Sequence, residues 1–271
     1  MPNMSLLDNI IIELFTRLAR RIAIAGFAAC GLFTINQEVY GQSNHPAIIF
    51  PEFSYQMGIP AGDFSNRFGN HLGLSGGINY QSGNSPINLA LRYSLYFGNQ
   101  VKEDVLFPFR TSYEGLLIGF DQFLTELKLR ERAFMVHASA GSLIPLDHNH
   151  SYRKSIRYQM GVGFFEHRIR FVDDASALPQ FTSSLIQGLD RLSNGLALIP
   201  SIGYESLSDL GKFSWYAGVE SIFGFTKDRR SYSYDLGQPA SSKTRLDILL
   251  QFKLSIYLPF SLSNVAEEIE Y

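Results

Sequence analysis

The sequence predicts an all-β fold, an eight-stranded antiparallel up-and-down transmembrane β-barrel with long extracellular loops. Three observations predict it: apolar and polar residues alternate at every second position, short and long connections alternate, and the composition combines 22 Phe and 14 Tyr with 23 Gly. Such a chain has ample apolar surface to bury and is not disordered. A single Cys excludes an intrachain disulfide framework, and a net charge of -2 argues against a nucleic-acid binder.

Residues 1–41 have the pattern of a secretory signal peptide. Three arginines between positions 17 and 21 precede an apolar run from 22 to 33, which is too short to cross a bilayer as a helix. Cleavage after Gly41 would start the mature chain at position 42. The alternatives are an uncleaved membrane anchor and a lipoprotein motif around Cys30.

The chain after the signal peptide alternates at the period of a β-strand. Large apolar or aromatic residues occupy every odd position from Ile87 to Phe97, and every even position from Leu246 to Phe260. Each such segment has one apolar and one polar face. Eight strands are predicted, at residues 47–59, 70–81, 86–97, 132–144, 153–171, 194–206, 212–226 and 244–260.

The connections between these strands are short after the second, fourth and sixth strands and longer after the others. The longest covers residues 98–131. An even strand number with short turns at one end and long loops at the other is typical of an outer-membrane barrel. The predicted barrel spans 42–260, its long loops face the outside, and residues 261–271 form a short periplasmic tail.

The sizes of the side chains on the two faces of each strand predict which face points to lipid. The interior of an eight-stranded barrel has room only for packed side chains, so the many large apolar residues must face outward. Closure then leaves no backbone unpaired in hydrocarbon. The small or polar set expected inside comprises Gly73, Ser75, Gly77, Ala90, Ser94, Gly161, Gly163, Gly203, Gly218 and Ser255.

Residues 43–260 resemble the outer-membrane β-barrel proteins of Bacteroidota, within the small-barrel class of the OmpA transmembrane domain, OmpX and OmpW. The resemblance rests on the junction Val39-Tyr40-Gly41-Gln42, on the segment from Ile59 to Phe64, and on an aromatic end to the last strand. It implies a porin-like fold in the outer membrane of a Gram-negative bacterium. The chain departs from the pattern by continuing about ten residues beyond the last strand.

Six charged residues fall on the inward face, three acidic and three basic. Buried charges must pair, so a lumen ion-pair plug is predicted. A narrow gated conduit is the alternative, whereas a wide porin needs about 16–18 strands. The plug residues are Glu52, Arg92, Arg157, Glu205, Glu220 and Lys253.

Two motifs raise the question of catalysis. His137 and Ser139 share a strand face and could act as base and nucleophile, as in a lipid A deacylase family that uses a His-x-Ser pair. However, they are expected to point into the lumen, and that chemistry needs a lipid-facing pair. His148 and His150 lie in a polar turn, where a metal site is the less favoured interpretation. We therefore expect no catalytic, cofactor or metal residues.

The long loops carry mixed charges, which favour neither an anionic nor a cationic ligand. Arg168, Arg170, Arg229 and Arg230 are candidates for lipopolysaccharide contact, the alternative being a solvated rim. Residues 123–132 could form a short helix over the mouth.

A structural or binding role is predicted, with loops that bind a partner or a barrel that serves as a subunit of an outer-membrane complex. The resemblance suggests one such complex by analogy, since the secretion machinery of Bacteroidota uses barrels of this kind. The expected partners are outer-membrane lipid, lipopolysaccharide and other envelope proteins, and no nucleic acid. The alternatives are a lipid A-modifying enzyme and a narrow channel.

Overall fold

The computed structural model describes residues 47–83, 85–110, 115–146, 154–174, 176–207, 214–257 and 260–261. The predicted signal peptide with Cys30, the pair His148 and His150, and the tail beyond residue 261 lie outside the described residues. No helix in these ranges has the length and apolar character required to cross a membrane.

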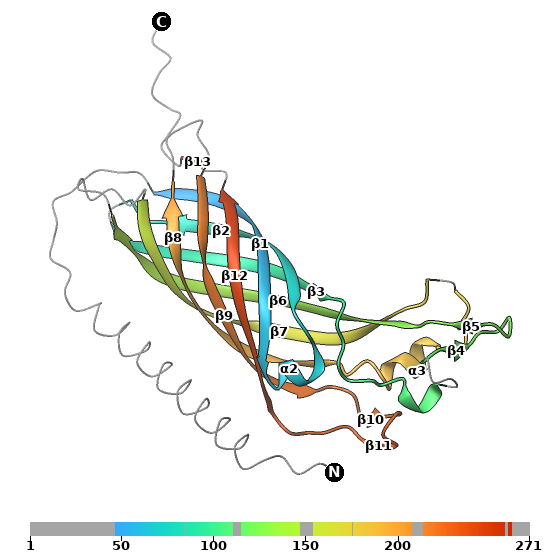
Figure 1. Ribbon diagram of the computed structural model, residues 1–271. Coiled ribbons are helices and arrows are strands. Elements are labelled where there is room, and N and C mark those ends of the chain that lie inside the picture. Colours follow the sequence, from blue (N-terminus) through green and yellow to red (C-terminus); the bar gives the residue numbers. More distant parts are fainter. Residues whose placement is uncertain are drawn as a thin grey trace, which may run out of the picture. The chain divides into compact units, whose positions relative to one another are not determined.

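Eight long strands form a closed antiparallel ring (Figure 1). Each strand pairs with the next along the chain, and the last pairs back to the first through eleven aligned positions from Glu52–Tyr257 to Gly62–Asp247. The predicted fold class is confirmed. The strands are β1 (Ile48–Gly62), β2 (His71–Gln81), β3 (Ile87–Gly98), β6 (Lys128–Pro145), β7 (Lys154–Val172), β8 (Ser193–Ser206), β9 (Ser214–Asp228) and β12 (Arg245–Tyr257), and a short β13 (Phe260–Ser261) also pairs with β1.

The predicted strand positions agree with these bounds within a few residues, with one informative exception. Strand β6 begins at Lys128, so the alternative of a short helix over residues 123–132 is wrong. The last residues of β7 supply the backbone partners for this early part of β6, since Lys128 aligns with Val172. Pairing to a long neighbouring strand therefore extends β6 beyond its apolar stretch.

The apolar faces of the strands point outward, as the bulk argument predicts. Phe53 and Ile59 on β1 are 60% and 63% exposed, whereas Glu52, which precedes Phe53, is 1% exposed. The cross-strand partners of the outward residues are also apolar, for example Met57 with Leu72 and Phe252. An apolar belt therefore surrounds a polar interior, the reverse of a water-soluble barrel.

The connections sort by length to the two ends of the ring, here called the turn end and the loop end. The long connections hold all the additional elements, and they gather at the loop end (Figure 1). These elements are α2 (Phe64–Arg67), a 3-10 helix η1 (Phe107–Phe109), β4 (Leu117–Ile118) paired with β5 (Leu124–Thr125), α3 (Ser183–Gln187), and β10 (Tyr232–Ser233) paired with β11 (Gln238–Pro239).

The short helix α2 turns inward and fills the lumen at the loop end. Phe64 and Phe68 are fully buried, and the Phe64 ring lies 5.9 Å from the Phe165 ring of β7. These two phenylalanines, the aromatic plug, pack in one apolar cluster with lumen and loop side chains, including Met135 and Leu106. The loops and the barrel thus share a single apolar core at this end.

Candidate functional site

The middle of the lumen holds a central charge cluster of Glu52, Arg92, Glu220 and Lys253, contributed by four different strands. The Glu52 carboxylate lies 2.9 Å from Nε of Arg92 and 2.8 Å from Nζ of Lys253. Nζ of Lys253 also lies 3.8 Å from the Glu220 carboxylate. All four side chains are at most 2% exposed, so Glu52 bridges two cations away from water.

Neutral side chains add hydrogen bonds to Glu52 and Arg92 in this cluster. Asn79 donates to Glu52 at 2.7 Å and accepts from Arg92 at 2.8 Å. Oγ of Ser139 accepts from Arg92 at 2.7 Å, and Oγ of Ser255 donates to Glu52 at 2.8 Å. A buried ion pair is tolerated only when such additional bonds offset its loss of hydration. The cluster therefore links strands from around the barrel.

A second cluster, the turn-end cluster, comprises Arg157, Glu205, Tyr216 and Tyr257. Nη1 of Arg157 lies 2.6 Å from Glu205, and the Tyr257 hydroxyl donates to the same carboxylate at 3.0 Å. The Arg157 guanidinium lies 4.0 Å from the Tyr216 ring centroid, a cation–π distance. Phe50 packs against Tyr257. The six plug residues chosen from sequence are thus found inside the lumen, in two adjacent groups.

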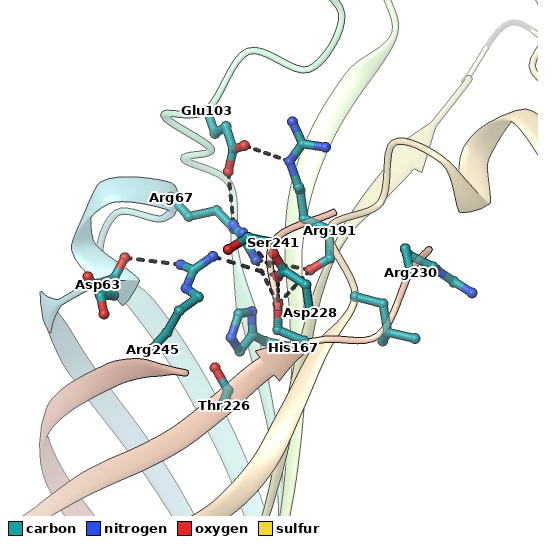
Figure 2. A network of polar contacts seen from close by, with 12 residues as sticks. Asp63, Arg67, Glu103, His167, Arg191, Thr226, Asp228, Arg230, Ser241 and Arg245 are labelled. Atoms are coloured by element: carbon teal, nitrogen blue, oxygen red, sulfur yellow. Dashed lines mark hydrogen bonds and ion pairs between the residues drawn. The ribbon is translucent and has the colours of Figure 1, made fainter. Parts of the chain in front are cut away.

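The loop end holds the mouth network of Arg67, Glu103, Arg191, Ser193, Asp228 and Asp235. Figure 2 shows four of these residues: Arg67, Glu103, Arg191 and Asp228. Nε of Arg67 lies 2.9 Å from Glu103, and its Nη1 donates to the Arg191 carbonyl oxygen at 3.0 Å and to Ser193 at 3.1 Å. Arg191 in turn lies 2.6 Å from both Glu103 and Asp235. Arg67 thus joins α2 to the connections that follow β3 and β7, and Arg191 extends the link to the connection after β9.

Below the mouth network, a histidine and an aspartate pair inside the lumen. Nε2 of His167 lies 2.8 Å from Asp247, which also accepts from the Thr226 hydroxyl. Arg245 donates to the Asp63 carbonyl oxygen at 3.3 Å, and its Nη2 lies 3.8 Å from Asp247. The first two contacts link β7, β9 and β12, and Arg245 joins β12 to Asp63, the residue before α2.

Glu103 is the acidic centre of the mouth network, and it lies on a loop outside the membrane-spanning strands. Burial by itself would raise the pKa of Glu103, but the guanidinium groups of Arg67 and Arg191 outweigh burial and hold this pKa below its ordinary value. The carboxylate therefore stays charged at neutral pH and keeps both arginines in place.

Sequence reasoning missed the mouth network as a unit. Glu103 and Arg191 counted among the mixed loop charges, and Arg67 follows the segment from Ile59 to Phe64 that carried the family resemblance. Period-two patterning assigns a side chain to a face of a strand, but gives no information on which loop residues meet. The run from Gly62 to Phe68, a turn followed by two phenylalanines within an otherwise polar loop, was the available signal.

His137 and Ser139 lie inside the lumen, as predicted, and both are buried. Ser139 accepts its hydrogen bond from Arg92, and no hydrogen bond joins it to His137. The hydroxyl is thus engaged in the central charge cluster. Within the described ranges no group of three or more His, Cys, Asp and Glu side chains could hold a metal ion.

The four arginines considered for lipopolysaccharide contact occupy different settings. Arg168 and Arg170 project outward from β7 and are exposed. Arg230 pairs with Asp190 at 2.5 Å, and Arg229 donates to Asn194. The structure therefore does not bring the four together into one patch.

The closed ring, the outward apolar belt and the polar filled lumen decide the class of protein. Only a closed barrel satisfies every strand hydrogen bond within hydrocarbon, and a belt of this kind is stable only in lipid. This is the architecture of an outer-membrane β-barrel. The chain is thus an integral protein of the outer membrane, because that is where lipid-facing antiparallel barrels reside.

No protein-family model and no curated protein matches the chain. Solved structures similar to it include Neisserial surface protein A, with 10% identity over 78% of this chain and 97% of that one and a TM-score of 0.41. Ail of Yersinia pestis has 10% identity over 80% and 99%, with a TM-score of 0.40. A major outer membrane protein from Thermus thermophilus has 8% identity over 78% and 99%, with a TM-score of 0.43.

Proposed function

We propose that this outer-membrane barrel is a closed anchor that holds a packed set of loops at the membrane surface for binding to a partner. The observation that carries the proposal is the succession of obstacles along the lumen. The turn-end cluster, the central charge cluster and the aromatic plug, each made of buried side chains in mutual contact, follow one another along the lumen. The partly buried mouth network lies beyond them at the loop end.

The loops support the binding part of the proposal. They have buried residues of their own, including Leu117 and Leu178, and backbone bonds join separate loops, such as Phe120 N–H to the Ala177 carbonyl oxygen at 2.9 Å. Three phenylalanines on this packed region nevertheless remain exposed: Phe107, Phe120 and Phe123 at 76%, 71% and 74%. Exposed aromatic groups on a preorganised surface are typical of protein contacts.

The experiment is extraction of the full chain from its own membrane in mild detergent, followed by affinity purification and mass spectrometry. A protein that copurifies with the wild type, and is lost in a Phe120→Ser/Phe123→Ser variant, supports the proposal. Lys243→Gln, which changes an exposed residue of another loop, is the control variant. Recovery of the chain alone in both cases would contradict a stable partner.

The same preparation tests the two alternative functions. A narrow channel would give steady conductance in planar bilayers, whereas a closed anchor gives none. A lipid A-modifying enzyme would convert purified lipid A and lose that activity in His137→Ala. Because Ser139 is bonded to Arg92 inside the lumen, we expect no conversion by either form.

A further inference from the structure

Four arginines lie side by side on the outward face of β6 and β7 at the loop end. The register aligns Arg130 with Arg170 and Arg132 with Arg168, so two pairs of like charge face each other across neighbouring strands. These four residues, the outer arginine patch, include two that the sequence singled out and two that it did not. Like charges directly opposite each other in a sheet are destabilising unless an anion lies between them.

The described residues do not provide that anion. No carboxylate in these ranges lies within 4.0 Å of any of the four guanidinium groups. Lys128 lies 2.8 Å from Asp174, and Glu166, on the same face of β7, accepts a hydrogen bond from Asn194 at 3.0 Å. The outer arginine patch is therefore a cluster of four positive charges with no ion-pair partner among the described residues.

The patch begins where the apolar belt ends. The next outward residue on β6 is Phe134, whose ring lies 6.2 Å from Tyr93 and 6.1 Å from Phe164. A molecule that covers these rings with an acyl chain would place its headgroup at Arg132 and Arg168. The position thus selects for an amphiphile whose headgroup is anionic.

Arginine specifies the chemistry of that headgroup. Its planar guanidinium donates two parallel hydrogen bonds to a phosphate, and the charge-assisted bonds are about twice as strong as neutral ones. Opposed residues of antiparallel strands lie about 5 Å apart at Cβ, so two arginines can reach one phosphate.

We propose that the outer arginine patch binds the phosphate groups of an anionic lipid headgroup, of the lipopolysaccharide class, in the membrane leaflet at the loop end. The proposal rests on the membrane position given above, and it adds a defined lipid site to the anchor. Arg229 and Arg230 are outside this site, because Asn194 and Asp190 already engage them.

The test uses the full chain, folded in a zwitterionic detergent, and measures bound lipid by native mass spectrometry. The probes are purified lipopolysaccharide, the same lipid after enzymatic dephosphorylation, and inorganic phosphate at equal concentration. The variant is Arg132→Gln/Arg168→Gln. The control is Lys102→Gln/Lys243→Gln, which removes two positive charges from other loops.

We expect the arginine variant to bind phosphorylated lipid at least about tenfold more weakly than wild type and control, because it loses two charge-assisted contacts. Dephosphorylated lipid should bind the wild type as weakly as phosphorylated lipid binds the variant. Equal affinity of variant and control, or equal binding of the two lipids, would overturn the proposal. Binding of inorganic phosphate as tight as that of the lipid would overturn the lipid assignment.

Heat-dependent gel mobility separates this outcome from failure of the anchor itself. If the wild type shows no compact, heat-sensitive band, the barrel assignment fails before any lipid measurement. If wild type and variant both show that band while their lipid binding is equal, only the arginine site fails.

Discussion

The ammonium group of Lys253 lies 2.8 Å from the carboxylate of Glu52, which joins the last long strand of the barrel to the first through their side chains. The backbone register aligns Lys253 with Gln56, four residues away from Glu52, so the lysine side chain reaches along the lumen to make this contact. Ring closure and charge pairing thus occur at the same seam.

The first prediction concerns that seam. Glu52→Gln keeps the size of the side chain but leaves Arg92 and Lys253 without their shared carboxylate. Removing one partner of a buried ion pair costs about 3–5 kcal/mol, so the free energy of unfolding should fall by that amount. Urea titration, followed by the heat-sensitive gel band of the folded barrel, measures this free energy. Glu126→Gln, an exposed loop residue, should change it by less than about 0.5 kcal/mol. An equal midpoint for both variants would contradict the role of the central charge cluster.

The second prediction concerns the mouth network. Arg67→Met removes the guanidinium that bonds to Glu103, the Arg191 carbonyl and Ser193, so the loops should open locally while the strands remain paired. Proteinase K should cleave the loops roughly tenfold faster, with the barrel fragment still protected. Lys102→Met, which removes a charge bonded only to the Ser65 carbonyl oxygen, is the matched control. Unchanged cleavage in Arg67→Met would show that the loops pack independently of this residue.

The third prediction concerns the aromatic plug. Phe64→Ala should lower the free energy of unfolding by about 3–5 kcal/mol, because the cavity it leaves is enclosed by Phe68, Phe165 and other buried groups. Planar-bilayer recordings should still show no conductance, since the central charge cluster and the turn-end cluster remain. Phe107→Ala, at an exposed phenylalanine, should have little effect on either measurement. Steady current through the Phe64 variant would mean that the aromatic plug alone closes the lumen.

The fourth prediction is a pH dependence of the loops. Since the folded pKa of Glu103 is held below its ordinary value, its ionisation stabilises the mouth network at pH values above that ordinary value. This stabilisation is lost as the pH falls through the lowered pKa. Loop cleavage by an acid-active protease should therefore accelerate over that interval. Glu103→Gln should be cleaved faster at neutral pH and lose most of the pH dependence. Identical pH profiles for the two proteins would contradict the prediction.

The sequence predicts the strands and their faces well, for a reason visible in β1 and β12. From Phe53 to Ile59 and from Leu246 to Ile256, each successive residue changes face, so a period of two assigns each side chain to lipid or lumen. The inward location of Glu52, Arg92 and Lys253 follows from that period alone. Which of them pair does not follow, because contacts inside the ring depend on strand tilt and on the reach of each side chain.

The contacts at the loop end do not follow from the period of two. Arg67, Glu103 and Arg191 lie far apart in the chain, and no periodicity relates one loop to another. The inward turn of α2 depends on the space that Phe165 and Met135 leave in the lumen, and the early start of β6 depends on the length of β7. The sequence by itself determined a lipid-facing, eight-stranded barrel. Only the tertiary structure decided that α2 turns into the lumen, that the mouth network joins the loops, and that Arg130 and Arg132 lie opposite Arg170 and Arg168. Side chains from separate segments meet only once the ring has closed.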